Sequence, residues 1–284
     1  MATFTNQATL SYNNTTTTSN IVTGEIVEVL SATKTALTDT YRAGDTVTYV
    51  VSIVNSGSVS YSDLTLVDNL GEYTFGMGTR VPLTYVTGSV HYFLDGVLQP
   101  APTVIDEQPL TITGIDVPAM GNTLVIYQAR INEFAPVDTD GSITNTVRIT
   151  NDADTIDITA STTIFSEDSV LLSITKSISP STIPENGRLT YTFVIQNTGN
   201  TPAVATDNVQ VTDDFNPVLE NIVVTLNGVA LTEPTQYTYN ETTGLFQTVA
   251  GVITVPAATY TQDPVTGTWT VNPGTATLTV TGTV

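Results

Sequence analysis

The sequence contains no cysteine, a single histidine and few basic residues. Without cysteine the chain forms neither a disulfide nor a thiolate metal site, and His91 alone excludes a metal site built from several histidines. The 7 Lys and Arg residues against 27 Asp and Glu residues give a net charge of −20 at pH 7. Because nucleic acids and anionic membranes attract basic surfaces, this charge balance excludes both as natural partners.

Long hydrophobic runs are also missing. No run approaches the roughly 18 apolar residues of a membrane-spanning helix, so we expect no transmembrane segment. The first ten residues lack a basic region and an apolar core, so we expect no secretory signal peptide either. Hydrophobic residues nevertheless make up 40% of the chain, a share that predicts a folded protein.

The abundant residues are those that favour β-strands. Thr, Val, Ile and Tyr dominate, and Thr46–Ile53 alternates with a period of two. Turn pairs such as Asn227-Gly228 recur at short intervals, and helical periodicity is absent. The pattern predicts an all-β chain built from sandwiches.

The chain repeats itself once. Residues 44–57 match residues 186–199 at a constant offset, and Lys34 falls on Lys176 at the same offset. A length of 284 residues suits two domains of about 100–200 residues each. We expect two β-sandwich domains, over residues 29–158 and 159–284.

The two copies end differently. The first continues into an expected final strand at residues 143–149, whereas the second ends at residue 284 before such a strand. Residues 4–10 match that final strand, with Asn6 on Asn145. We therefore expect the second domain to lack its final strand, and residues 1–28 to form a donor strand and linker.

A sandwich without its last strand leaves an open edge that templates pairing. The N-terminal strand could fold back onto its own second domain, insert into that of a neighbour, or remain a disordered tail. Folding back requires a connector stretched along the whole first domain, so we favour exchange between chains, a form of β-augmentation. Such a contact is heterologous and propagates into a filament unless the rotation closes a ring.

Both lysines of the chain occupy apolar rows. Side chains at alternate positions of a strand share one face. Applied to the matched positions of the two copies and of the N-terminal strand, this rule places six polar residues on core faces: Lys34, Lys176, Asp68, Asp213, Asn145 and Asn6.

A buried ammonium or carboxylate costs several kcal/mol unless it is paired or neutralised. One interpretation is a Lys–Asp ion pair hydrogen-bonded to Asn. The second, which we favour, is a spontaneous Lys–Asn isopeptide bond assisted by the Asp. Burial leaves the amine neutral and nucleophilic, and it leaves the acid protonated so that it can polarise the carboxamide.

The internal repeat, combined with the rule that alternate residues of a strand share one face, predicts two crosslinks. Lys34 and Asn145 would form an intramolecular bond assisted by Asp68. Lys176 would bond to Asn6 of the next subunit, assisted by Asp213. This chemistry requires no metal and no cofactor. The acidic segments 137–141 and 151–154 are interpreted as solvated turns rather than calcium sites.

The string formed by Lys34, residues 44–49, residues 55–57, Asp68 and residues 143–145 resembles the DUF11 conserved-repeat domain of bacterial surface proteins. Its second copy resembles that domain again, without the terminal Ile-Thr-Asn. The resemblance implies immunoglobulin-like sandwiches in stalks, adhesins and coat layers. A surface-type protein without a signal peptide is also similar to the appendage and coat proteins of clostridial spores.

These observations predict a structural subunit of a cell-surface or spore-surface filament. Its main partner is expected to be itself in a head-to-tail homopolymer, with separate anchoring or cap proteins. The alternative is an adhesin or surface-layer binding module. We expect no enzyme acting on an external substrate, because no phosphate loop, nucleophile elbow or zinc signature is present.

Overall fold

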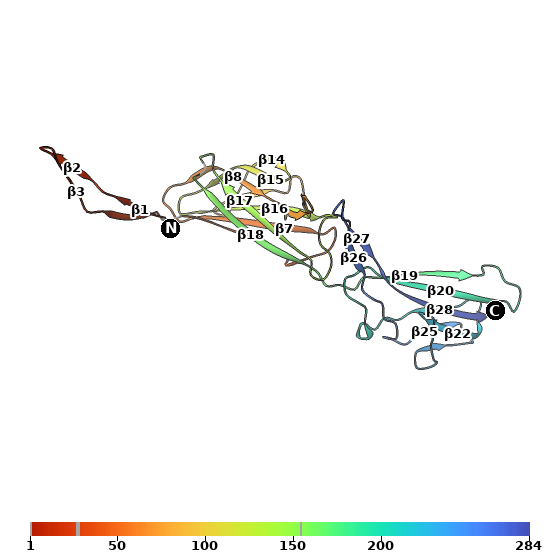
Figure 1. Ribbon diagram of the computed structural model, residues 1–284. Helices are drawn as coiled ribbons and strands as arrows, with labels where there is room; N and C mark the ends of the chain where they lie inside the picture. The colour runs from red at the N-terminus through yellow and green to blue at the C-terminus, as the bar shows by residue number, and fades with distance from the viewer. Residues whose placement is uncertain (1, 27–28, 154) are drawn as a thin grey trace.

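The computed structural model describes residues 2–26, 29–153 and 155–284. The chain is elongated, with an N-terminal hairpin at one end, a sandwich in the middle and a second sandwich at the other end (Figure 1). The described residues are almost entirely strands and loops, apart from a short 3₁₀ turn at Ala205–Asp207. They contain no helix that is long and apolar enough to cross a membrane.

The first sheet of the first sandwich carries Lys34 on its edge. Its order is β13-β12-β16-β7-β5, and β11 pairs with β16. The strands are β5 (Leu30–Ala36), β7 (Thr46–Asn55), β11 (Leu83–Tyr85), β12 (His91–Leu94), β13 (Val97–Gln99) and β16 (Asn122–Ile131). All the described neighbours in this sheet are antiparallel.

The second sheet of this sandwich carries Asp68 and Asn145 on neighbouring strands. Its order is β14-β15-β8-β17-β18-β6. The strands are β6 (Thr40–Tyr41), β8 (Tyr61–Asp68), β14 (Thr103–Glu107), β15 (Leu110–Val117), β17 (Ser142–Thr150) and β18 (Asp157–Ser166). β17 and β18 form a long antiparallel hairpin, and β18 also lies against β5 of the other sheet.

Strand alternation builds the core between these sheets. In β7 the side chains of Val47, Tyr49, Val51 and Ile53 are buried, as its period of two predicts. They pack against buried residues of the facing sheet such as Leu66. The first sandwich therefore has its own continuous hydrophobic core.

The second sandwich repeats the first sheet but only half of the second. One sheet has the order β19-β20-β28-β22-β23, and the other has the order β21-β25-β24. The strands are β19 (Leu172–Ser179), β20 (Arg188–Asn197), β21 (Thr212–Asp214), β22 (Glu220–Leu226), β23 (Val229–Ala230), β24 (Tyr237–Tyr239), β25 (Leu245–Thr248) and β28 (Gly274–Thr283). Phe215, Phe246 and Leu278 are among its buried core residues.

The prediction of an all-β chain of two immunoglobulin-like sandwiches, the second incomplete, is confirmed. By sequence repeat and sheet order, β19 corresponds to β5 and β21 corresponds to β8. The three-stranded sheet ends at β21, where the first sandwich continues with β17 and β18. Within the described residues, the second sandwich thus lacks counterparts of both strands of that hairpin.

The matched Asn-x-Gly segments of the two copies anchor equivalent turns. The Asn55 side-chain amide donates to the carbonyls of Val59 and Pro118. Asn197 donates in the same way to the carbonyls of Thr201 and Pro256. The amide oxygen of each Asn accepts a hydrogen bond from the glycine two residues on, at 2.9 Å in both copies. This motif of the repeat therefore has a structural role.

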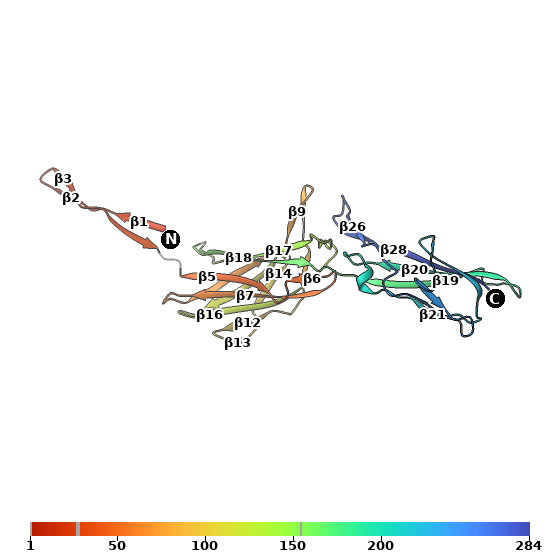
Figure 2. The same ribbon diagram turned by 90° about the horizontal axis from the view of Figure 1, so that it is seen from below.

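The N-terminal segment is a two-stranded hairpin that projects away from both sandwiches (Figures 1 and 2). β1 (Ala2–Asn6) pairs with β4 (Val22–Ile26), and β2 (Thr9–Tyr12) pairs with β3 (Thr15–Thr18). Asn13 and Asn14 both have positive φ at the tip, as a tight hairpin turn requires. Much of the segment expected to be a linker after the donor strand is therefore the second arm of the hairpin.

The junction between the sandwiches is held by hydrogen bonds. A hairpin of the second sandwich, β26 (Thr259–Gln262) and β27 (Trp269–Asn272), reaches the hairpin of the first formed by β9 (Tyr73–Phe75) and β10 (Gly78–Arg80). Arg80 Nε donates to the Thr266 carbonyl at 2.6 Å, and Gln262 Nε2 donates to the Tyr73 hydroxyl at 2.8 Å. The expected boundary between residues 158 and 159 falls inside β18, so the first sandwich extends to Ser166.

Candidate functional site

Three of the predicted site residues meet inside the first sandwich. Lys34 lies on β5, Asp68 ends β8 and Asn145 lies on β17, and all three are buried. Lys34 Nζ lies 2.5 Å from Asp68 Oδ2, and neither side chain is exposed to solvent. The other carboxylate oxygen of Asp68 accepts a hydrogen bond from the Leu70 backbone amide at 2.9 Å. The two sheets thus bring an amine and an acid into direct contact in the core.

A fourth residue, Tyr127 on β16, links the acid to the amide. Its hydroxyl donates to Asp68 Oδ2 and accepts a hydrogen bond from Asn145 Nδ2 at 3.3 Å. The Tyr127 ring stacks on Tyr49 with 5.6 Å between ring centroids. The Lys34 ammonium lies 5.0 Å from the Tyr49 centroid, within range of a cation–π contact. Tyr127 is not among the site residues predicted from the sequence. The only signal available was its position on the apolar face of an alternating strand.

Burial dominates the electrostatics of this cluster. It lowers the pKa of Lys34 to about 8, although the neighbouring Asp68 carboxylate raises that pKa. Burial also raises the pKa of Tyr127, and the Asp68 charge raises it further. The phenol therefore stays protonated and able to donate, while the lysine gives up its proton far more easily than it would in water.

Two buried polar atoms of the cluster, the Tyr49 hydroxyl oxygen and Asn145 Oδ1, have no hydrogen-bond partner within the described residues. Asn145 Oδ1 is buried and receives no hydrogen bond within the described part of the chain. Leaving a buried acceptor unpaired costs about 1–3 kcal/mol. The cluster therefore holds an amine of lowered pKa, an acid and an amide whose oxygen is still available to a donor. Chemically, these groups suffice for an Asp-assisted attack of the amine on the carboxamide.

The second lysine site is open where the first is closed. Lys176 and Asp213 form an ion pair, but their side chains are 41% and 18% exposed. Lys176 Nζ lies 4.4 Å from the ring centroid of Tyr191, the counterpart of Tyr49. Strand parity placed Lys176 on a core face, yet every residue of β19 is exposed. The expectation of a buried Lys176 is wrong for the single chain, because the strands that cover the first site have no described counterpart here.

The second site also differs in its aromatic lining. Val280 on β28 lies opposite Tyr191, as Tyr127 on β16 lies opposite Tyr49. Phe215 stacks on Tyr191 with 4.9 Å between centroids. The second site therefore has no phenol at the position from which Tyr127 contacts Asp68.

The last predicted residue, Asn6, stands far from the second site of its own chain. It ends β1 and is exposed. The hairpin that carries it lies at the opposite end of the chain from the second sandwich (Figure 1). Within one chain, the fold therefore does not bring Asn6 to Lys176 or Asp213.

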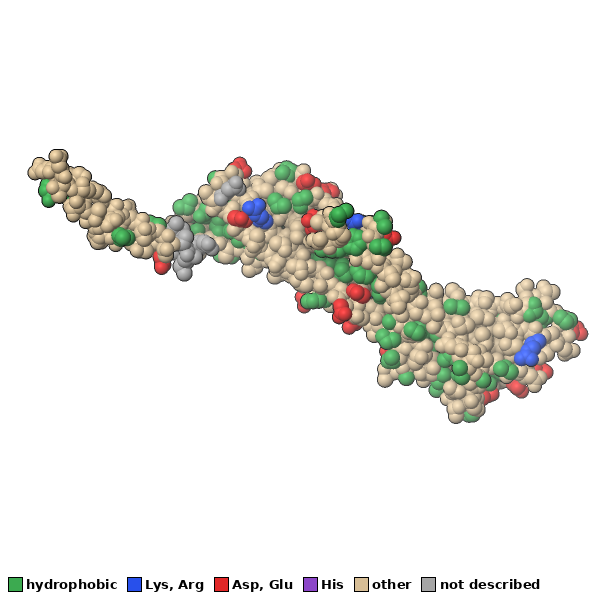
Figure 3. Space-filling model, in the orientation of Figure 1, with side chains coloured by type: hydrophobic (Ala, Val, Ile, Leu, Met, Phe, Trp, Pro, Cys, Tyr) green, Lys and Arg blue, Asp and Glu red, His purple; other side chains and the backbone are tan. Residues whose placement is uncertain are grey.

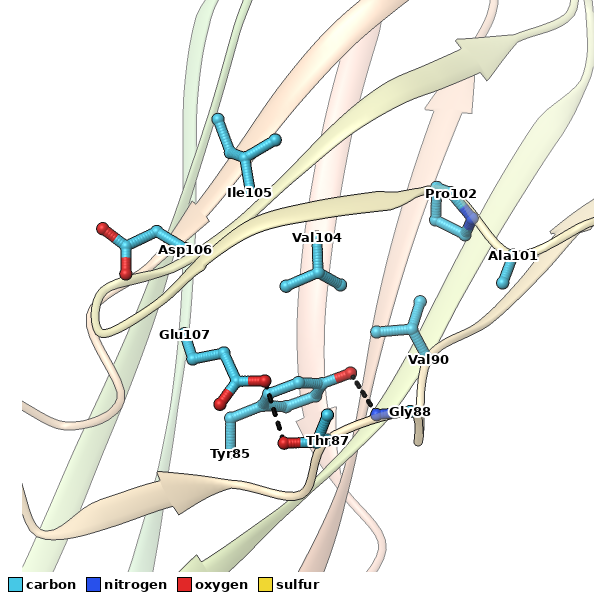
Figure 4. Close-up of a pocket in the computed structure, with 10 residues that line it drawn as sticks. All are labelled: Tyr85, Thr87, Gly88, Val90, Ala101, Pro102, Val104, Ile105, Asp106 and Glu107. Atoms are coloured by element: carbon cyan, nitrogen blue, oxygen red, sulfur yellow. Dashed lines mark hydrogen bonds between the residues drawn. The ribbon is translucent and has the colours of Figure 1, made fainter.

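Other candidate features lie away from the lysine sites. A pocket of about 570 Å³ opens beside β14, where Thr87 Oγ1 donates to Glu107 at 2.8 Å and Gly88 donates to the Tyr85 hydroxyl (Figure 4). The residues that line it include no histidine and no lysine. His91 is exposed. The described residues contain no group of three or more His, Asp or Glu side chains arranged to hold a metal ion.

Known proteins with similar folds include bacterial pilins. The pilus backbone RrgB of Streptococcus pneumoniae is 12% identical with a TM-score of 0.34, over 86% of this chain and 55% of that one. BcpA, the major pilin subunit of Bacillus cereus, is 14% identical with a TM-score of 0.35, over 96% and 73%. The Corynebacterium diphtheriae major pilin SpaA is 11% identical with a TM-score of 0.31, over 85% and 57%.

This chain therefore spans little more than half the length of RrgB and SpaA. No family model matches the sequence, and no curated protein matches it. The resemblance to the DUF11 domain and to spore appendages stays a prediction.

Proposed function

We propose that this protein is the structural subunit of an extracellular filament, on the cell or spore surface. The N-terminal strand of each subunit inserts into the open second sandwich of the next subunit. One observation carries the proposal. The three-stranded sheet of the second sandwich ends at β21, where the first sandwich continues with β17, while the sequence match of β17 lies at the far end of the chain and pairs only within its own hairpin.

Both surfaces that would meet are apolar and exposed in the single chain. On the hairpin, Phe4 is 54% exposed and Leu10 is 61% exposed. On β19, Ile174 is 53% exposed. Burying such side chains is favourable by roughly 25 cal/mol per Å² of apolar surface. The open edge of β21 adds backbone groups that an incoming strand can pair.

The geometry favours exchange between subunits over closure within one. The hairpin and the open sandwich lie at opposite ends of the chain, with the first sandwich between them (Figures 1 and 2). A contact between two different surfaces repeats without limit unless its rotation closes a ring. A head-to-tail fibre is the expected product, and RrgB, BcpA and SpaA are pilus proteins by name.

We further propose that both lysines become crosslinked. Asp68 takes the proton of Lys34, the neutral Nζ attacks Cγ of Asn145, and the protonated acid polarises Oδ1. The Nζ–Cγ bond forms, the Cγ–Nδ2 bond breaks, and Nδ2 leaves as ammonia with the transferred protons. The product is a neutral amide, which removes the burial penalty of the ion pair.

At the second site, Asn6 of the next subunit would supply the missing amide to Lys176 and Asp213, making each junction covalent. The reaction consumes only the protein's own groups, so no cofactor and no external substrate enter the proposal. Anchoring or cap proteins would complete the fibre at its ends.

Two measurements on purified full-length protein test this function. Negative-stain microscopy is expected to show fibres whose length increases with protein concentration. An SDS gel of the boiled sample is expected to show a ladder, and each linked subunit should lose the mass of one ammonia molecule per crosslink. A protein that remains monomeric at every concentration contradicts the filament.

A substitution separates the covalent step from assembly. Asn6→Ala removes the amide but leaves the apolar face of the hairpin, so fibres should still form and should dissolve in hot SDS. Thr5→Ala on the opposite face of β1 is the matched control and should keep the ladder. A ladder that survives Asn6→Ala contradicts the assignment of Asn6.

A further inference from the structure

In the first sandwich, the lysine strand and the aspartate strand are separated by two strands on the closed side. β17 pairs with β8, and β18 pairs with β17 and lies against β5. In the second sandwich the corresponding strands are β19 and β21, and within the described residues each has a strand partner on one side only. A single inserted strand would extend the sheet from β21 and leave the β19 side uncovered.

The row of side chains on β19 shows what remains uncovered. Leu172, Ile174 and Ile178 are exposed, and Lys176 shares their face by strand alternation. The matching row on β5 consists of Leu30, Ala32, Lys34 and Ala36, in which the lysine is buried and the others pack partly buried against the core. The difference between the two rows follows from the strand that lies against β5.

The N-terminal hairpin carries a second arm suited to that place. In β17 and β18, Asn145 lies opposite Thr162, and Ile143 lies opposite Ile164 on the same inward face. In the hairpin, Asn6 lies opposite Val22. Val22 therefore shares the face of Asn6, as opposite residues of an antiparallel pair do.

The two faces of the hairpin differ in polarity. Phe4 lies opposite Gly24 and stacks so closely over it that a Cβ there would meet the ring at 2.4 Å. The reverse face carries Thr5, opposite Thr23, and Glu25. Glu25 is the only charged residue in the described hairpin, and Figure 3 shows the hairpin with almost no charged surface. In a chain of net charge −20, a nearly uncharged donor avoids repulsion by the acidic acceptor.

We infer that the donor is the whole hairpin of a second copy of this chain, with β1 and β2 taking the place of β17 along β21 and β4 taking the place of β18 over β19. The inference rests on the proposed function and specifies the docked element. The register of the first sandwich transfers directly: Val147 pairs with Asp68 and Ile149 pairs with Leu66. Their counterparts place Ala8 opposite Asp213 and Leu10 opposite Val211.

The second arm also gives the junction its chemistry. In the single chain the Lys176 side chain is 41% exposed, and no described strand lies over β19. Covering it with β4 repeats the burial that lowers the pKa of Lys34. The lysine becomes reactive only when the complete hairpin has docked, so unassembled subunits do not crosslink to stray amides.

Paired substitutions in the full-length chain test the inference. Val22→Asp places a carboxylate on the docking face of the second arm, and Thr23→Asp places the same charge on the reverse face. Burying an unpaired carboxylate is strongly unfavourable, so Val22→Asp should lower the yield of SDS-resistant ladder about tenfold or more. Thr23→Asp should stay within about twofold of the parent, as expected for an exposed position.

Phe4→Asp in the first arm distinguishes the inference from the proposed function. If Phe4→Asp blocks assembly but Val22→Asp assembles like Thr23→Asp, a single strand is the donor and the hairpin inference is wrong. If Phe4→Asp also assembles normally, donor insertion itself is wrong. Equal losses from Val22→Asp and Thr23→Asp overturn the assignment of the docking face.

Hydrogen exchange on unsubstituted filaments provides a second test without any mutation. An isolated two-stranded hairpin is only marginally stable in water, so the amides of Val22–Ile26 should exchange rapidly in the monomer. In filaments, these amides and those of Leu172–Ser179 should become protected at least about tenfold. Continued rapid exchange of β4 in filaments that protect β1 overturns the inference.

Discussion

Replacing Asn145 with leucine separates a crosslinked first sandwich from one held by an ion pair. Leucine has the same number and branching of side-chain heavy atoms as asparagine, so Asn145→Leu removes the carboxamide without leaving a cavity or another polar group. The substitution changes no atom of the Lys34–Asp68 pair, whose charged groups lie 2.5 Å apart in the structure. The two interpretations then differ only in whether a covalent bond has been lost.

The expected loss in the free energy of unfolding differs widely between a crosslinked and an uncrosslinked first sandwich. Positions 34 and 145 enclose a loop of about 110 residues, and closing a loop of about that length stabilises a fold by about 4.7 kcal/mol. Without a crosslink, Asn145 contributes one hydrogen bond of 3.3 Å to Tyr127, worth about 1 kcal/mol. Removal of the unpartnered Oδ1 offsets that loss. We therefore expect a loss of about 4–5 kcal/mol with the crosslink and about zero without it.

Scanning calorimetry on non-assembling protein measures this difference. On the Phe4→Asp background, the transition of the first sandwich should fall by roughly 10–20 °C in Asn145→Leu. Ser142→Ala, on the exposed face of the same strand, should change stability by less than about 0.5 kcal/mol. Intact mass should show an ammonia loss in the parent that Asn145→Leu lacks. A parent of full mass, with Asn145→Leu within about 1 kcal/mol of it, refutes the crosslink.

Three further predictions concern the two sites. Lys176→Ala should give fibres that dissociate in hot SDS, whereas Lys34→Ala should weaken the subunit and keep the ladder; a gel beside a micrograph distinguishes them. The reactive pair shares one proton that must move from Lys34 to Asp68, and with a Lys34 pKa of about 8 that proton is lost above this pH. Ammonia release during refolding, followed by mass, should therefore slow as pH rises above about 8; a rate that keeps rising contradicts the role of the acid. Tyr127→Phe should slow the first crosslink about tenfold and leave the second unchanged, since Val280 stands at that position; equal slowing at both sites contradicts a local positioning role.

Much of the fold follows from local rules that the sequence displays directly. Alternation in residues such as Thr46–Ile53 predicts strands and the face that each side chain takes. The internal repeat then aligns Lys34 with Lys176, and the match of Asn6 to Asn145 predicts an unfinished second domain. Each of these inferences uses only neighbouring positions or a shared offset, so none requires knowledge of which strands pair.

Sheet order is what local rules leave open. Parity placed Lys176 on a core face, but a face is buried only if another element covers it, and no described strand covers β19. For the same reason, local rules did not predict how many strands the second sandwich lacks. The second sheet is missing described counterparts of two strands, β17 and β18, rather than of one. Local rules also did not identify Tyr127, whose inward parity resembles that of any core tyrosine until β16 is placed opposite Asp68.

The sequence by itself thus determined the strands and the repeat, and it predicted a displaced final strand and six polar residues on core faces. Only the tertiary structure decided which of those faces are closed, because closure depends on contacts between strands far apart in the chain. Lys34 is buried between two complete sheets. Lys176 is partly exposed, because the sheet that faces it ends at β21. That difference arises from pairing energies between distant segments, which periodicity along a single strand does not encode.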